Sequence, residues 1–229
     1  MSMPLTLARV PLMRVVRAPR GILPVVGWII VAIASAVVIH SRGTPNGADH
    51  VMRGSFGRFI LPLIAYGVVS AVLGTKGLRR AIRGVVALGA SPAKAALAAV
   101  VVAAVISALV AAAVAVGVAA IAHGSHDPPL ARDALACMWI SALGGAAYAS
   151  FFAAGSAIGK GAMRAVFFGI DWILGAGAGF GSIFVPRGHL ESLFGGALAA
   201  DVPQRASTLL LVVLAVAYAA LAVRLSRRA

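Results

Sequence analysis

Long uncharged, apolar runs alternate along this chain with short segments that carry nearly all of its charges. The runs cover about 21–40, 59–75, 95–122, 134–158, 165–185 and 206–223. A helix needs roughly 20 apolar residues, at about 1.5 Å each, to cross the hydrocarbon core of a bilayer. The pattern therefore predicts an all-α membrane protein with six transmembrane helices, in a single transmembrane domain over residues 1–229.

The charges between these runs are distributed unevenly. Six spans place alternate connections on the same side, and 14 of the 20 Lys and Arg residues fall on the side that holds both termini. Five of the six acids fall on the other side: Asp49, Asp127, Asp133, Glu191 and Asp201. Because Lys and Arg are enriched in cytoplasmic loops, both termini are expected in the cytoplasm, with the chain multi-pass in the inner (cytoplasmic) membrane. Topology thus accounts for the net charge of +14, and no nucleic-acid partner is expected.

Two short segments outside the spans have an amphipathic pattern. Within 75–89, Leu78, Ile82, Val85 and Val86 recur at helical spacing, while Arg79, Arg80 and Arg83 occupy the complementary side. This pattern predicts a short helix lying along the cytoplasmic membrane surface; a solvated or headgroup-bound loop is the alternative. A second interfacial helix is predicted at about 4–19, before the first span.

The layout and one stretch of sequence resemble a known family. An interfacial N-terminal helix, six spans and "LRRAIRGVVALGASPAKAALAAVVVAAVISAL" from Leu78 onward are similar to the membrane (permease) subunit of type-2 ABC exporters, the ABC-2 permease family. "FVPRGHLESLFGG", before the last span, resembles the short re-entrant outer helices of that family. One departure is Thr75-Lys76-Gly77, where many members carry a glutamate.

The resemblance implies a partner for the helix after the second span. In that family this coupling helix docks onto a separate ABC ATPase subunit, which binds ATP and Mg. The corresponding residues here are Leu78, Arg79, Arg80, Ile82, Arg83 and Val86.

The function implied by the resemblance is that of the transmembrane subunit of an ATP-driven exporter. It would work in membrane lipid as a dimer with a second permease copy or a paralogue, and would move a lipid, peptide or other hydrophobic compound. The alternatives are an ATP-independent small channel or membrane scaffold, or an ABC permease that handles copper or haem.

The chain itself is not expected to be an enzyme. "GSAIGKG" (155–161) is one residue short of a phosphate-binding loop and has glycine where that loop needs a hydroxyl. The sequence contains no serine nucleophile elbow and no H-E-x-x-H metalloprotease motif. We therefore predict no catalytic residues and no cofactor in this chain.

Two further features are candidates for chemistry. Asp171 is the one acid inside a predicted span, where an ionisable side chain costs about 2.5 kcal/mol or more. Pairing with an arginine, such as Arg164 or one from 79–83, is favoured over a role in transport. His123, His126 and Asp127 in "HGSHDPP" form a possible metal-binding trio for copper or zinc, with an ordinary turn as the alternative.

Overall fold

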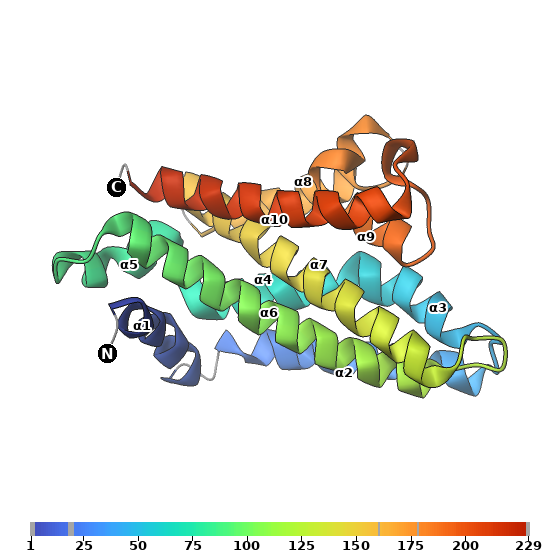
Figure 1. Cartoon of the computed structure of the whole chain (residues 1–229). Coiled ribbons are helices and arrows are strands. Elements are labelled where there is room, and N and C mark those ends of the chain that lie inside the picture. The colour runs from blue at the N-terminus through green and yellow to red at the C-terminus, as the bar shows by residue number, and fades with distance from the viewer. Residues whose placement is uncertain (1–2, 18–20, 160, 178, 228–229) are drawn as a thin grey trace.

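The computed structural model describes residues 3–17, 21–159, 161–177 and 179–227, and within these ranges the chain forms helices and no strand (Figure 1). The elements are α1 (Met3–Arg17), α2 (Leu23–Ser41), α3 (Gly47–Val51), the π-helix η2 (Met52–Ile60), α4 (Leu61–Leu73), α5 (Leu78–Ala87), α6 (Pro92–Ala122), α7 (Leu130–Ile158), α8 (Met163–Leu174), η3 (Phe180–Phe184), α9 (Pro186–Leu193), η4 (Ala199–Asp201) and α10 (Gln204–Ser226).

Five of these helical segments are long and apolar enough to cross a membrane. They are α2, the segment Gly47–Ala87 that includes α3, η2 and α4, then α6, α7 and α10. The mean hydropathy of their most apolar windows lies between 1.5 and 2.9. The prediction of an all-α, multi-pass membrane protein is therefore confirmed at this level.

The predicted fifth span at 165–185 differs from the structure. α8 has 12 residues, about 18 Å of helix, which is too short to cross a bilayer. Beyond Leu174 every second residue from 175 to 181 is glycine, and Gly177 has a φ of +104°. Each glycine costs a helix about 1 kcal/mol relative to alanine. The chain thus continues through the short elements η3 and α9, because an apolar run rich in glycine is not a stable helix.

α6 and α7 form the centre of the bundle, and α4 and α10 pack against α7 (Figure 1). The backbones of α6 and α7 approach closely, since a Cβ added at Gly145 would lie 2.6 Å from the carbonyl oxygen of Ser107. Small residues permit such contacts in membrane bundles. Tyr148, Phe151 and Phe152 are fully buried and fill the middle of the bundle with aromatic rings.

The two ends of the bundle differ in charge. α1, α5 and the last turn of α10 lie at one end, on the left of Figure 1, which we call the basic end. It carries Lys76, Arg79, Arg80, Arg83, Lys94, Arg224 and Arg227. The opposite end holds α3 and the 123–129 connection, and is called the acidic end because Asp49, Asp127 and Asp133 lie there. α1 and the last turn of α10 thus lie at the same end of the bundle.

Candidate functional site

α5 is an amphipathic helix at the basic end with sharply defined limits. It follows Gly77, whose φ is +88°, and Gly89, with a φ of +90°, lies just beyond its last turn. Leu78 and Ile82 are buried against the bundle, whereas Arg80 and Arg83 are exposed and Arg79 and Val86 are half-buried. Leu88, directly after the helix, is 89% exposed. The structure therefore places a helix where the amphipathic pattern predicted one, with Arg80 and Arg83 facing outward.

α1 holds α5 to the end of α4 through one side chain. Arg14 donates one hydrogen bond to the carbonyl of Val72 and a second to that of Ala81, each at 3.1 Å. Val72 belongs to the last turn of α4 and Ala81 to the middle of α5. α1, which corresponds to the predicted 4–19 helix within the described residues, thus connects two elements of the basic end.

The turn before α5 packs backbone to backbone on the turn after α7. A Cβ added at Gly77 would lie 2.8 Å from the carbonyl oxygen of Ser156, and one at Gly161 would lie 1.9 Å from that of Thr75. Such close approaches leave no space for the two turns to slide independently. The turn before α5 is therefore in direct backbone contact with the end of α7.

Arg164, at the start of α8, secures the same junction. Its guanidinium donates to the Gly74 carbonyl at 2.5 Å, the Ser70 hydroxyl at 2.8 Å and the Gly161 carbonyl at 3.1 Å. Gly74 is the C-cap of α4, so this cation also meets the negative end of the helix dipole. α4, α7 and α8 therefore meet beside α5.

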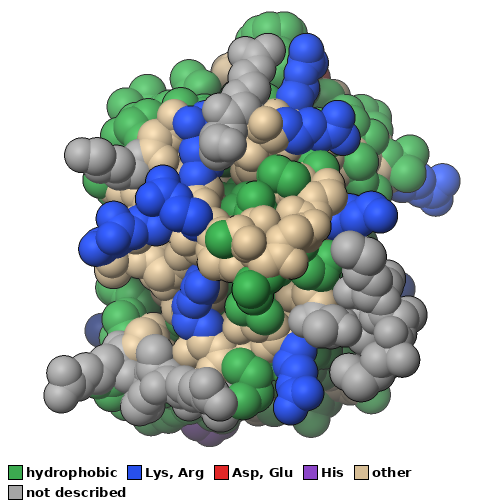
Figure 2. All heavy atoms as spheres, turned by 90° about the vertical axis from the view of Figure 1, so that its left-hand side faces the viewer, with side chains coloured by type: hydrophobic (Ala, Val, Ile, Leu, Met, Phe, Trp, Pro, Cys, Tyr) green, Lys and Arg blue, Asp and Glu red, His purple; other side chains and the backbone are tan. Residues whose placement is uncertain are grey.

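The surface of the basic end is strongly positive. Figure 2 shows Lys and Arg side chains spread over this face, with no Asp or Glu among the described side chains visible there. Between α5 and the end of α10 lies a cleft of about 260 Å³, lined by Arg79, Ile82, Arg83, Val86, Pro92 and Ser226. Four of the six residues predicted to contact an ATPase thus line one cleft, which combines apolar side chains with two cations.

Asp171 is fully buried, and its partners differ from the predicted ones. Tyr148 donates its hydroxyl proton to one carboxylate oxygen at 2.9 Å, and the backbone N–H of Arg187 donates to the other at 3.2 Å. The prediction of a pair with Arg164 or an arginine of 79–83 is wrong, since no such ion pair occurs in the described residues. Arg164 lies two turns nearer the basic end and donates its hydrogen bonds to carbonyl oxygens there. The Arg187 guanidinium stacks over Trp172 at 4.4 Å. Asp171 therefore joins α7, α8 and α9.

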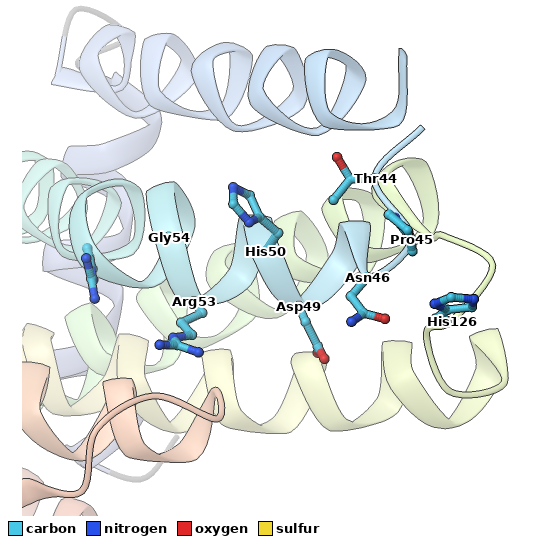
Figure 3. Close-up of a pocket in the computed structure, with 9 residues that line it drawn as sticks. Thr44, Pro45, Asn46, Asp49, His50, Arg53, Gly54 and His126 are labelled. Carbon is cyan, nitrogen blue, oxygen red and sulfur yellow. The ribbon is translucent and has the colours of Figure 1, made fainter. Parts of the chain in front are cut away.

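A polar cleft of about 730 Å³ opens near the acidic end (Figure 3). Its lining comes from the connection after α2, from α3, from the π-helix η2 and from His126: Thr44, Pro45, Asn46, Asp49, His50, Arg53, Gly54, Arg58 and His126. Arg58 is paired with Glu191 of α9 at 2.5 Å. π-Helical turns within α-helices frequently occur at functional sites, and η2 supplies the basic side chains of this cleft.

The predicted metal-binding trio is only partly brought together. His123, Asp127 and Asp133 each offer a ligand atom within 4.8 Å of the other two. His126 lines the cleft instead, so Asp133 takes the place that the sequence assigned to this histidine. Asp133 was missed because it lies outside the HGSHD segment. A signal was present, since Asp133 falls in the first turn of the helix that follows this segment.

No family model, curated protein or solved structure matches this chain. The arrangement of its own residues therefore carries the functional argument.

Proposed function

We propose that this chain is the transmembrane subunit of an ATP-driven exporter, with the basic end in the cytoplasm and a separate nucleotide-binding subunit docked on α5. The observation that carries the proposal is the fixed position of α5. Its apolar side is anchored by Leu78 and Ile82, while Arg80, Arg83 and Leu88 are exposed. A helix that served only to hold a loop in the cytoplasm would need the charges but not these anchors.

The anchors give α5 a mechanical role in this proposal. Arg14 attaches α5 to α1 and α4, and the backbone contacts of Gly77 and Gly161 attach it to α7 and α8. A push from an ATPase on α5 would therefore move several helices together. The exposed apolar Leu88 and the cleft beside Arg79 and Arg83 supply both hydrophobic and charged contacts for such a partner.

The substrate route in this proposal lies between two copies of the chain. Tyr148, Phe151 and Phe152 fill the middle of a single bundle. α2 and α10 leave many large apolar side chains uncovered, including Ile30 and Val37 on α2 and Val213 and Val216 on α10. Lipid or a second copy covers such surfaces in a membrane. A lipid, peptide or other hydrophobic substrate agrees with these apolar walls.

The test is co-purification of the tagged chain with its nucleotide-binding partner. Arg79, Arg80 and Arg83 are replaced together by glutamate, and the matched control replaces Lys94, Arg224 and Arg227, which are exposed at the same end. Both variants change the net charge equally, so any general effect on membrane orientation is shared. We expect the amount of ATPase subunit that co-purifies with the α5 variant to be at least ten-fold lower than with the wild type. The control variant is expected to retain the wild-type amount.

Two results would contradict the proposal. One is recovery of the wild-type chain without any nucleotide-binding subunit. The other is equal retention of the partner by the α5 variant and the control. Either result would favour an ATP-independent channel or scaffold.

A further inference from the structure

Three acids and a histidine converge where α3, α6 and α7 meet at the acidic end. His123 caps the end of α6, Asp127 lies in the following connection and Asp133 lies in the first turn of α7. The ligand atoms of His123, Asp127 and Asp133 are within 4.8 Å of one another. Asp49 of α3 is close enough to interact electrostatically with both aspartates. In Figure 3 the Asp49 side chain points toward α7, whereas His50 points to the opposite side.

This cluster has no cationic partner in the part of the chain that the structure describes. In the described residues the ion pair is Arg58–Glu191. None of the three clustered aspartates lies within 4.0 Å of a Lys or Arg nitrogen among these residues. Within the described residues the three aspartates thus lack such a partner, although the chain carries 20 Lys and Arg residues. The cluster also lies at the C-terminal, negative end of the 31-residue helix α6. These charges together favour a bound cation.

Each residue of the trio retains a buried ligand atom without a hydrogen-bond partner. These atoms are Nδ1 of His123, Oδ1 of Asp127 and Oδ2 of Asp133. Asp133 is only 6% exposed, and its other oxygen is in contact with the Cys137 thiol at 3.7 Å. Acids often stabilise the first turn of a helix, but that effect does not satisfy a buried carboxylate oxygen. Buried polar atoms without partners are uncommon in proteins.

The other oxygen of Asp127 holds the site in place. It accepts hydrogen bonds from the backbone N–H groups of Ala48, at 2.9 Å, and Gly124, at 2.8 Å. The backbone N–H of His126 donates a hydrogen bond to the Pro45 carbonyl at 2.9 Å. Hydrogen bonds within the chain thus hold the connection between α6 and α7 against the start of α3.

We propose that His123, Asp127 and Asp133 form a site for a divalent transition-metal ion, with Zn²⁺ as the best fit. Imidazole nitrogen and carboxylate oxygen both bind Zn²⁺ at about 2.0 to 2.2 Å, and three protein ligands leave a fourth position open. Asp49, which also lines the polar cleft, lies between that cleft and the site. Bound zinc clamps the end of α6 to the start of α7, and Asp127 connects both to α3 by accepting a hydrogen bond from the Ala48 N–H.

The test measures zinc on the full-length chain, purified in detergent, stripped with a chelator and dialysed against Zn²⁺. We expect one zinc per chain by mass spectrometry. At Zn²⁺ about 100-fold above Kd, we expect the midpoint of thermal unfolding to rise by about 5 to 10 °C. His123→Ala and the isosteric Asp133→Asn abolish both effects. His126→Ala is the matched control, because this histidine lies in the same connection but outside the cluster, and it retains both.

Co²⁺ in place of Zn²⁺ identifies the ligands by its visible absorption. Nitrogen and oxygen ligands give ligand-field bands without the charge-transfer band of a thiolate ligand. We expect the ligand-field bands to disappear in His123→Ala. The proposal is overturned if the wild-type chain binds no zinc, or if His123→Ala binds as much as the wild type. It is also overturned if His126→Ala loses zinc as fully as His123→Ala, because the ion would then occupy the cleft. None of these results depends on the ATPase, so the site and the proposed transport function are tested separately.

Discussion

Arg164 is 2% exposed, yet in the described residues its hydrogen bonds go to neutral oxygens and to no carboxylate. A buried cation without an acid is costly unless its donors are satisfied. The carbonyls at the end of α4 are also without intrahelical partners, as at any helix C-terminus. The arginine and the helix end therefore satisfy each other, and the junction beside α5 depends on this one side chain.

Replacing Arg164 by methionine tests this dependence. Hydrogen bonds to charged groups contribute about 1.5 to 3 kcal/mol each, and the Gly74 carbonyl would lose its donor. We expect the free energy of unfolding to fall by about 2 to 4 kcal/mol, with a lower midpoint of thermal unfolding in detergent. Arg80→Met, on the exposed side of α5, is the control and should change little. Equal midpoints for the two variants would show that Arg164 does not stabilise the junction.

At the scale of elements, two glycines with opposite properties lie at the start of α5 and inside it. Gly77 precedes the helix with a φ of +88° and touches the Ser156 carbonyl, so a side chain there is both strained and crowded. Gly84 lies inside the helix with nothing near its absent Cβ. The first glycine is required by the fold, whereas the second only weakens the helix.

Gly77→Ala and Gly84→Ala are therefore expected to change stability in opposite directions. Gly77→Ala should lower the free energy of unfolding by more than about 1 kcal/mol. Gly84→Ala should raise it by about 0.5 to 1 kcal/mol, because alanine favours a helix interior. Thermal unfolding of the two variants, measured side by side with the wild type, checks the signs. A loss of stability in both variants would contradict the open surroundings of Gly84.

The elements also show what sequence can and cannot predict. α2, α6, α7 and α10 were predictable because length and hydropathy alone decide whether a helix crosses a membrane. The break after α8 was missed because hydropathy scores glycine as neutral and ignores its conformational freedom. The partners of Asp171 depend on how α7 meets α8 and α9. No local pattern in the sequence encodes that arrangement.

At the scale of the whole molecule, the basic end is expected to face the cytoplasm. The chain has one cysteine, Cys137, so Cys137→Ala provides a background for single-cysteine labelling. In this background Leu88→Cys, at the basic end, should react with a membrane-impermeant maleimide only after the cells are opened and the cytoplasmic face of the membrane is accessible. Ser125→Cys, at the acidic end, should react in intact cells. The reverse pattern of labelling would place the acidic end in the cytoplasm and contradict the proposed orientation.

The short elements α8, η3 and α9 have a consequence for the biogenesis of the protein. α8 is too short to enter a bilayer as an independent span, and it carries Asp171, which is satisfied by Tyr148 of α7 and by the backbone of α9. Tyr148 precedes Asp171 in the chain, so α7 is synthesised before the helix whose carboxylate it satisfies. We therefore expect α8 to enter the membrane by packing onto α7 and not as an independent span.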